Sequence, residues 1–291
     1  MHVKRSNYFI PFKKESDVQG ALGRMARGAF VHQQVAGMYI WLPLGLRMLE
    51  KVMRVIEREH EKIGAQKLLM PILQEANLWK QSGRYQEYGP EMLKLFDRHK
   101  REFVYGPSAE EMFTQLLTKW PLNKNSFPMI LYNMQWKFRD EIRPRFAVVR
   151  SREFLMKDAY SFDKTPEDMM KTYEKMFNVY SNIFGKLNLN VCTFSSDVGI
   201  MGGSLSHEFV IKSEFGETMV EFENWPKQPL QWHERDNVRV IEEQQACAKC
   251  EGSKYAEIGH IYALGQKYTQ TFRLLNCEDQ QAIYMGCYGI G

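Results

Sequence analysis

Hydrophobic residues recur with a helical period over two stretches of the chain. Over residues 46–63 they lie about 3.6 residues apart while charged residues take the other positions, which predicts an amphipathic helix of about five turns. Gly64 follows directly and is typical of a helix end. Thr165 before Pro166 marks the start of a second helix, which we expect to run to Gly185 with a methionine- and aromatic-rich stripe facing the core.

Alternation with a period of two predicts strands elsewhere. Residues 137–158 have the pattern of two half-buried strands joined by a loop, and residues 97–107 that of a hairpin with a charged turn. Residues 187–224 alternate as strands around a glycine-rich turn. The apolar stretch 64–73 contains Pro71, and since proline cannot donate to a ladder we expect this strand at a sheet edge or an interface.

The stretch 137–158 also carries the strongest chemical signal. It holds five arginines, two lysines and four carboxylates between its apolar positions. A guanidinium group grips phosphate oxygens through a planar fork, and a half-buried arginine needs a specific partner. The pattern therefore indicates a polyphosphate and a planar ring held on a sheet surface. The alternative interpretation is a strand hairpin with surface ion pairs.

The segment FRDE at 138–141, followed by Arg150 and Phe154, resembles motif 2 of the class II aminoacyl-tRNA synthetases. The surrounding RPRF and REFLMKDAYSF narrow the resemblance to prolyl-tRNA synthetases of the bacterial and mitochondrial type. It implies an α+β fold in which an antiparallel sheet is flanked by helices. It also implies that Arg139 bridges the ATP α-phosphate and the amino-acid carboxylate, and that Glu141 accepts from the adenine amino group. Arg150 would be a second nucleotide contact and, with Arg139, a catalytic residue, while Phe154 would stack on the adenine.

The helix over 46–63 and the strand with Pro71 together resemble motif 1 of the same enzymes, at about residues 44–73. In that family motif 1 builds the homodimer interface. The pattern alone is equally consistent with a helix packed on its own sheet. The resemblance favours a homodimer.

Ser108-Ala109-Glu110 stands where the family has a Thr-x-Glu loop that holds the imino group of proline. A secondary ammonium has two N–H donors, and a carboxylate plus a hydroxyl accept both. The resemblance therefore assigns Ser108, Glu110 and the carboxylate contact of Arg139 to proline. In an alternative interpretation Ser108 caps the following helix and Glu110 and Glu111 decorate its first turn. The two interpretations are compatible.

Two later segments, GGSLSHEF and EIGHIYALG, are similar to strands beside the amino-acid and ATP pockets of the family. The resemblance makes His207 and Glu208 candidates for lining the proline pocket, although a lone strand histidine is ordinarily a core residue. Glu257 and His260 would lie near the nucleotide or its metal, and Tyr262 would supply an aromatic wall for the proline ring. ATP and Mg²⁺ are the implied ligands, and no side chain is assigned as a metal ligand.

The last residues, 285–291 (MGCYGIG), resemble the opening of motif 3. The resemblance thus describes residues 1–291 as a class II catalytic domain, with neither an editing insertion nor an anticodon-binding domain expected in this chain. Cys247 and Cys250 form half of a zinc knuckle. The other cysteines lack the spacing of a second half, so we expect a turn without metal.

Composition limits the kinds of partner and the cellular compartment that we expect for this chain. With 44% apolar residues and no uninterrupted apolar stretch of membrane-spanning length, we expect no membrane partner. The net charge of +4 is too modest to predict nucleic-acid binding by itself. An odd set of five scattered cysteines fits a reducing compartment, either a bacterial cytoplasm or a mitochondrial matrix.

The resemblance implies a proline–tRNA ligase that activates L-proline with ATP and transfers it to tRNA(Pro). The alternative is a synthetase-like protein that binds proline, adenylate or a partner without completing catalysis. Ser108 in place of threonine favours this alternative, as do Ala147 and Ser151 where the family usually has glycine. A threonyl or seryl enzyme is disfavoured by SHEF and GCYGIG.

Overall fold

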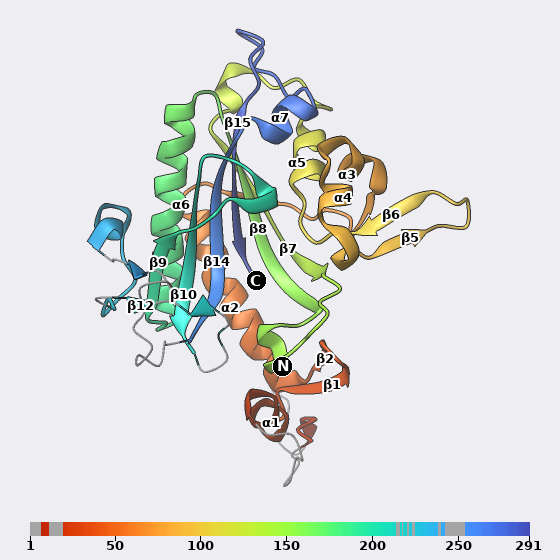
Figure 1. Cartoon of the computed structure of the whole chain (residues 1–291), viewed down its shortest axis with the longest axis vertical. Helices are drawn as coiled ribbons and strands as arrows, with labels where there is room; N and C mark the ends of the chain where they lie inside the picture. The colour runs from red at the N-terminus through yellow and green to blue at the C-terminus, as the bar shows by residue number, and fades with distance from the viewer. Residues whose placement is uncertain are drawn as a thin grey trace.

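The computed structural model of the chain describes residues 7–11, 20–213, 216, 218–219, 221–222, 225–237, 240–241 and 254–291. An eight-stranded sheet forms its centre (Figure 1). The strand order is β3-β7-β8-β15-β14-β10-β9, and β11 pairs with β14. The strands are β3 (Gln66–Lys67), β7 (Met129–Phe138), β8 (Glu153–Asp163), β9 (Val191–Ser195), β10 (Leu205–Lys212), β11 (Thr218–Met219), β14 (Lys254–Gly265) and β15 (Tyr284–Ile290).

The expected α+β architecture, with helices flanking a sheet, is confirmed. Strands β7 and β8 pair in antiparallel register from Met129 opposite Phe162 to Phe138 opposite Glu153, so the predicted pair of strands in 137–158 is present. The short edge strand β3 runs parallel to β7. The expected antiparallel sheet therefore has one parallel pairing, at its short edge strand.

Residues 64–73 do not form the single strand that their apolar pattern predicts. Strand β3 lies at the edge of the central sheet, as expected, and the chain then passes Pro71, which has no N–H for the ladder. Beyond it, β4 (Leu73–Glu75) joins a separate three-stranded sheet in the order β4-β6-β5. The predicted hairpin of residues 97–107 lies there, with β5 at Lys94–Phe96 and β6 at Glu102–Tyr105.

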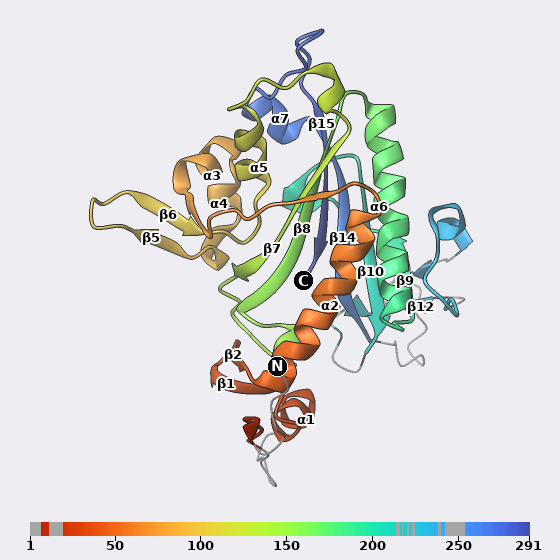
Figure 2. The ribbon, with the colours of Figure 1, turned by 180° about the vertical axis from the view of Figure 1, so that it is seen from behind.

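Helices α2 (Pro43–Glu61) and α6 (Pro166–Lys186) lie on one face of the central sheet (Figure 2). Both predicted helices are present. Thr165 caps α6 by accepting a hydrogen bond from the backbone N–H of Asp168, and Gly64 has φ 76° just after α2. The apolar stripe of α6 is buried against the sheet, and α2 packs beside it.

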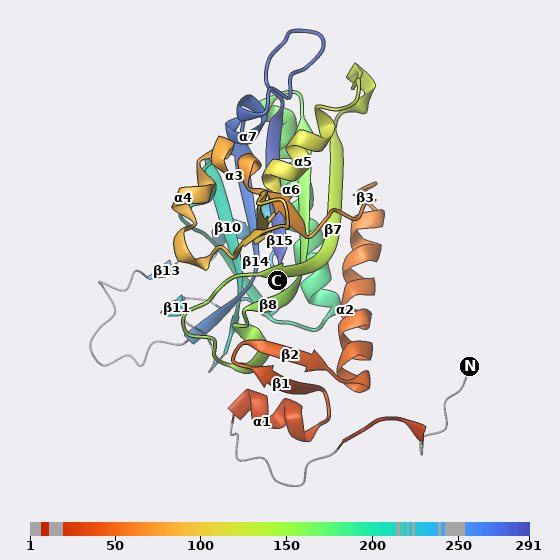
Figure 3. The ribbon, with the colours of Figure 1, turned by 90° about the vertical axis from the view of Figure 1, so that its right-hand side faces the viewer.

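Helices α3 (Ala76–Ser82), α4 (Arg84–Glu87), α5 (Glu110–Leu117) and α7 (Lys267–Thr271) lie on the other side of the sheet from α2 (Figures 1 and 3). The buried rings of Phe113 and Tyr268 pack with residues of β7, β8 and β15 on this side. Trp79 centres a smaller cluster under the β4-β6-β5 sheet. The two faces of the central sheet therefore have separate cores.

Helix α1 (Gly20–Arg27) and the hairpin of β1 (Val31–Val35) and β2 (Met38–Trp41) lie at one end of the molecule, beside the start of α2 (Figure 3). The remaining short elements are strands β12 (Glu221–Phe222) and β13 (Val240–Ile241) and 3₁₀ helices at Gly89–Glu91, Lys124–Ser126, Ala147–Val149, Gly199–Met201 and Trp232–Asn237. Within the described ranges, no helix has the length and apolar character needed to cross a bilayer.

Alternation along the central strands decides which side chains meet. On β7, Leu131 joins the core beneath α5, whereas its neighbour Tyr132 joins the core beneath α6. The same switch separates Tyr160 from Ala159 on β8. Because successive side chains of a strand point to opposite faces, each strand supplies one set of residues to the helical core and another to the opposite face.

Candidate active site

A cavity of about 580 Å³ lies between the central sheet, the start of α5 and the loops that follow β7 and precede β10. Most residues that the sequence assigned to proline and ATP line this cavity. They are Ser108, Glu110, Arg139, Glu141, Arg150, Phe154, Glu257, His260 and Tyr262. They come from residues 108–110, 139–154 and 257–262, so the fold brings together segments that are far apart in the sequence.

The loop before α5 fixes one end of the cavity. The side chain of Gln74 donates through Nε2 to the backbone oxygen of Ser108 at 2.8 Å, and the backbone N–H of Ala109 donates to the hydroxyl of Tyr160 at 2.9 Å. A Cβ at Gly106 would lie 2.0 Å from Nε2 of Gln74, so this position needs glycine for its close approach. Both bonds hold the loop so that Ser108 and Glu110 face the cavity.

Ser108 does not cap α5, which corrects the alternative interpretation of its role. The residue at the N-cap is Ala109, and no side chain caps this end of the helix. The hydroxyl of Ser108 instead accepts a hydrogen bond from Nη2 of Arg84 at 2.7 Å. The hydroxyl is therefore committed to a charged partner rather than to the helix backbone.

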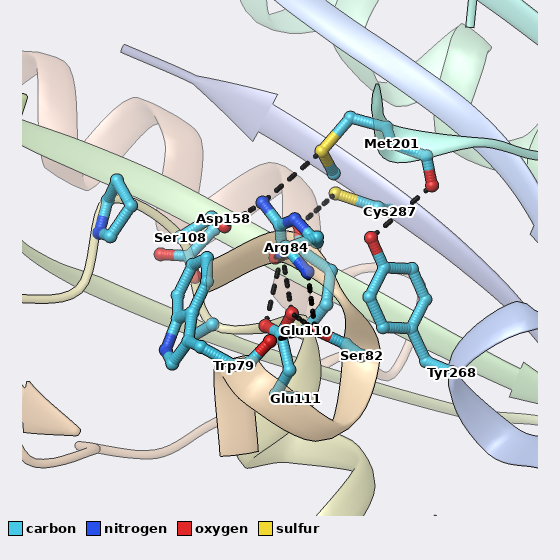
Figure 4. A network of polar contacts seen from close by, with 12 residues as sticks. Trp79, Ser82, Arg84, Ser108, Glu110, Glu111, Asp158, Met201, Tyr268 and Cys287 are labelled. Carbon is cyan, nitrogen blue, oxygen red and sulfur yellow. Dashed lines mark hydrogen bonds and ion pairs between the residues drawn. The ribbon is translucent and has the colours of Figure 1, made fainter. Parts of the chain in front are cut away.

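Arg84 holds the acidic end of the cavity together (Figure 4). Its Nη1 lies 2.8 Å from Oε2 of Glu110 and 3.1 Å from both carboxylate oxygens of Glu111. All three side chains are buried. The thiol of Cys287 on β15 donates to Oε1 of Glu110 at 3.2 Å, so both oxygens of that carboxylate have partners.

These contacts divide the charge between two adjacent carboxylates. Burial acts to raise the pKa of Glu110, but the guanidinium of Arg84 and the hydroxyl of Ser108 outweigh it and leave this pKa below its ordinary value. Burial raises the pKa of Glu111, and Arg84 offsets this only in part. Of the two carboxylates, Glu110 is therefore the one whose ionised form the surrounding contacts favour.

Arg139 occupies the middle of the site. It directly follows β7, where its backbone N–H donates to the oxygen of Arg152 at 2.8 Å. Its Nη2 lies 3.4 Å from the backbone oxygen of Pro107, at the acidic end, and its guanidinium carbon lies 5.4 Å from the ring centre of Phe154. Arg139 thus contacts both the loop that carries Ser108 and the aromatic ring at the other end.

The loop between β7 and β8 forms the opposite end of the cavity. Glu141 pairs with Arg150, with Oε2 and Nη2 2.8 Å apart, and also accepts from the backbone N–H of Arg143. Burial opposes these contacts, but together they lower the pKa of Glu141. Phe146 and Ala147 both adopt the left-handed region, with φ 60° and 56°, which is costly for residues with a Cβ. The Glu141–Arg150 pair therefore joins the two ends of this loop.

Strand β14 adds a carboxylate and two stacked rings. The rings of His260 and Tyr262 stack with their centres 4.0 Å apart, and Nδ1 of His260 lies 3.2 Å from Oε1 of Glu257. Glu208 on β10 completes a group with Glu257 and His260 whose candidate ligand atoms all lie within 4.8 Å of one another. The sequence assigned no metal ligand, yet two carboxylates and an imidazole at this spacing can accept a divalent cation.

His207 does not belong to this site, and its assignment to the proline pocket is corrected. It lies on the opposite face of β10, where its Nδ1 is 2.8 Å from the hydroxyl of Tyr173 and its ring packs against Phe177 and Trp232. Glu208, its neighbour, points to the cavity side instead. The physical reason is the period of two along a strand, which separates adjacent side chains.

Sequence reasoning missed Arg84, Met201 and Cys287, all of which line the cavity. Arg84 follows Gly83, which has φ 84° between two short helices, and Gly-Arg between helical stretches is the one local signal that marks it. Nothing in the spacing of residues 84 and 110 predicts their ion pair. The predicted turn at Cys247 and Cys250 lies outside the described residues.

Comparison with known proteins places the chain among synthetases. Residues 91–291 match the family model described as the tRNA synthetase class II core domain for G, H, P, S and T. The chain is 41% identical over 319 residues to a proline–tRNA ligase of Caulobacter sp. (strain K31), covering 99% of this chain and 72% of that protein. It is 39% identical over 307 residues to a proline–tRNA ligase of Ehrlichia chaffeensis, with the same coverage, 99% and 72%.

Solved structures show the same fold. A Giardia lamblia prolyl-tRNA synthetase in complex with prolyl-adenylate matches with a TM-score of 0.70 at 19% identity, over 90% of this chain and 48% of that chain. The Cryptosporidium parvum enzyme complexed with L-proline and AMP matches with a TM-score of 0.69 at 14% identity, over 93% of this chain and 50% of that chain. The chain thus spans about half the length of these solved structures.

Proposed function

The chain belongs to the proline–tRNA ligase family of class II aminoacyl-tRNA synthetases, and on that premise we propose that its cavity activates L-proline with ATP. A carboxylate oxygen of proline attacks the α-phosphorus, the bond from that phosphorus to the β-phosphate oxygen breaks, and pyrophosphate leaves. The terminal ribose hydroxyl of tRNA(Pro) then attacks the prolyl carbonyl carbon and AMP leaves. The observation that carries this proposal is the position of Arg139 between the Glu110 end and the Phe154 end of one cavity.

Proline is assigned to the acidic end. Its ring nitrogen is a secondary ammonium with two N–H donors, and the carboxylate of Glu110 beside the hydroxyl of Ser108 offers acceptors for both. Tyr262 supplies an aromatic wall for the apolar ring. The carboxylate of proline then points toward Arg139, whose guanidinium contacts the loop at Pro107 and the ring of Phe154.

ATP is assigned to the opposite end. Phe154 offers a face for adenine, and the Glu141–Arg150 pair stands where an adenine amino group and a phosphate would each find a partner. Arg139 would neutralise the charge that develops on the α-phosphate during attack. No side chain acts as a nucleophile. Catalysis in this site is positioning together with charge neutralisation.

Glu208, Glu257 and His260 are the residues that fit Mg²⁺ bound with the ATP phosphates. Burial, followed by the nearby Glu257 carboxylate, raises the pKa of Glu208, so a cation at this point would relieve the repulsion between the two carboxylates. When bound, the ion supplies charge neutralisation to the leaving pyrophosphate. The protein's own part is to hold these three donors in one place.

A homodimer is the proposed assembly, formed through α2 and its neighbours. Leu46 and Met48 at the start of α2 are 43% and 59% exposed, and Leu69 beyond it is 79% exposed. Large exposed apolar side chains at either end of α2 are candidates for contact with a partner, while Ile56 on the same helix is buried against the sheet. Helix α2 would then both pack on its own sheet and contact the partner subunit.

We propose that the reaction takes place in a bacterial cytoplasm or a mitochondrial matrix.

The test is ATP–pyrophosphate exchange with L-proline, run beside alanine, cysteine and threonine. We expect exchange that requires proline and Mg²⁺, and a Glu110→Gln variant that loses about tenfold to a hundredfold in kcat/KM for proline because a charge-assisted contact is gone. A matched Glu91→Gln variant changes a carboxylate that lines the cavity outside the Arg84 contacts and should retain exchange. Proline binding without exchange in the wild-type chain would favour the synthetase-like binding protein instead.

A further inference from the structure

We propose that Arg84 is a positioning residue for proline recognition, because it holds Glu110 and Ser108 in the geometry that binds the ring nitrogen. This inference rests on the proposed function. Arg84 does not touch proline in this arrangement and acts through the two residues that do. Its role would be to decide how tightly proline binds, with little influence on ATP.

The contacts of Arg84 reach both acceptors of the proposed proline site at once. Nη1 bonds Oε2 of Glu110 at 2.8 Å, and Nη2 bonds the hydroxyl oxygen of Ser108 at 2.7 Å. Nη2 also lies 3.4 Å from the sulfur of Met201, on the loop that covers this end of the cavity (Figure 4). One rigid planar group therefore sets the separation and direction of the carboxylate and the hydroxyl.

Aromatic rings fix the guanidinium itself. Its carbon lies 4.6 Å from the ring centre of Trp79, 5.6 Å from that of Tyr88 and 5.7 Å from that of Tyr268. Trp79 is in turn held by its Nε1, which donates to Oε1 of Gln74 at 2.9 Å. Gln74 also donates a hydrogen bond to the backbone oxygen of Ser108. The same glutamine therefore positions both Trp79, which packs on Arg84, and the loop that carries Ser108.

The charge of the cluster suits a cationic ligand. Arg84 contributes one positive charge and contacts the carboxylates of both Glu110 and Glu111, so the cluster is not an excess of positive charge that would repel the ammonium of proline. Groups from every neighbouring element face Glu110: Arg84 on α4, Glu111 on α5, Arg139 after β7, Asp158 and Tyr160 on β8, Tyr268 on α7 and Cys287 on β15. Within this set Arg84 is the guanidinium bonded directly to Glu110.

Arg84 and Arg139 therefore have different proposed roles in the site. Arg139 reaches the backbone oxygen of Pro107 and the ring of Phe154, and so faces the middle of the cavity. Arg84 is fully buried and bonded directly to Glu110. Loss of Arg139 should harm every step that involves ATP and proline together, whereas loss of Arg84 should harm proline binding alone.

The experiment compares Arg84→Gln and Arg84→Lys with the wild-type chain in proline-dependent pyrophosphate exchange, with KM measured separately for proline and ATP. We expect KM for proline to rise about 10- to 100-fold in Arg84→Gln, with partial recovery in Arg84→Lys, because lysine restores the charge but not the planar fork. KM for ATP should change by less than about threefold. Arg101→Gln, at a side chain that is 70% exposed and paired with Asp97 away from the residues lining the cavity, is the matched control and should leave KM for proline close to wild type.

The pH profile separates positioning from a purely structural role. Without the guanidinium, burial raises the pKa of Glu110, so KM for proline in Arg84→Gln should fall as pH rises from about 6 to about 8. In the wild-type chain Arg84 keeps Glu110 ionised and KM for proline should stay flat over this range. A structural defect would lower the active fraction at every pH without producing this slope.

A double variant, Arg84→Gln with Glu111→Gln, removes one charge of each sign and keeps the inference testable if the single variant does not fold. Circular dichroism reports whether each variant is folded. An unchanged KM for proline in folded Arg84 variants, or equal rises in KM for proline and ATP, would overturn the role of Arg84. A wild-type chain with no proline-dependent exchange and no proline binding by calorimetry would instead overturn the proposed function itself.

Discussion

The two faces of the central sheet are formed by the same strands, but buried cationic side chains have different partners on each face. On the cavity face, Arg84 keeps its charge because two carboxylates outweigh the effect of burial and raise its pKa well above the ordinary value. On the helical face, Lys157 is bonded to neutral partners, the hydroxyl of Tyr180 at 2.5 Å and the backbone oxygen of Tyr288 at 3.0 Å. Burial therefore lowers the pKa of Lys157 to about 7, against a smaller opposing effect of Asp158.

This difference shows that one face of the sheet mainly stabilises the fold, whereas the other face is suited to binding a charged ligand. The cavity face keeps ionised groups by giving each a charged partner, and so remains able to bind a charged ligand. The helical face fills its space mainly with rings, as around Phe177, and its buried Lys157 is bonded to neutral partners. Substitutions on the two faces should therefore be distinguishable, with stability lost on one and substrate handling lost on the other.

The largest expected effect is on the helical face. Phe177 is fully buried, with its ring centre 5.1 Å from that of Phe209 and 5.4 Å from that of Trp232. Phe177→Ala should lower the free energy of unfolding by about 3–5 kcal/mol because it leaves a cavity. Urea denaturation measures this, and Phe96→Ala, at a side chain 69% exposed, is the control. Equal losses in both variants would contradict the assignment of the core.

Arg139→Ala should break the cavity face without unfolding the chain. It removes the guanidinium between the proposed proline and ATP ends, so kcat/KM for pyrophosphate exchange should fall about a hundredfold to a thousandfold. Arg143→Ala, on an exposed residue of the adjoining loop, should stay near wild type. A Tm that drops steeply in Arg139→Ala would mean that this arginine supports the fold rather than the reaction.

The end of β8 offers a test by pH. Burial raises the pKa of Asp163 to about 6, against the hydrogen bond from Thr172. The folded state therefore keeps a proton that the unfolded state loses between about pH 4 and pH 6, and stability falls as pH rises through this range. Asp163→Asn removes the charge and should add about 1–3 kcal/mol at neutral pH, with no gain near pH 4. A gain that is the same at both values would reject this explanation.

The smallest expected effects test two neighbours on β10. His207→Asn should cost about 1 kcal/mol of stability, the value of its hydrogen bond with Tyr173, and should leave KM for proline unchanged. Glu208→Gln should leave stability nearly unchanged and raise the Mg²⁺ concentration needed for half-maximal exchange. If His207→Asn raised KM for proline instead, the placement of this histidine outside the site would be wrong.

Local pattern predicted much of the fold because its causes are local. The helix predicted from residues 46–63 and the cap at Thr165 appear where the sequence predicted them. The strand pair predicted within 137–158 is present as β7 and β8, but it extends outward to Met129 and Asp163. Pro71 marked an edge strand correctly, but nothing local showed that the chain would change sheets after it. The parallel pairing of β3 with β7 depends on where α2 returns the chain, which is a property of the whole fold.

The candidate site divides in the same way. The sequence by itself was enough to nominate Arg139, Glu141 and Phe154, because they lie within one stretch that resembles a motif of the family and has the pattern of a strand pair. Only the tertiary structure decided that Arg84 would stand behind Glu110, and that His207 would face the helices while Glu208 faces the cavity. Such contacts join residues from different elements, and the packing of those elements, rather than any local spacing, sets which side chains meet.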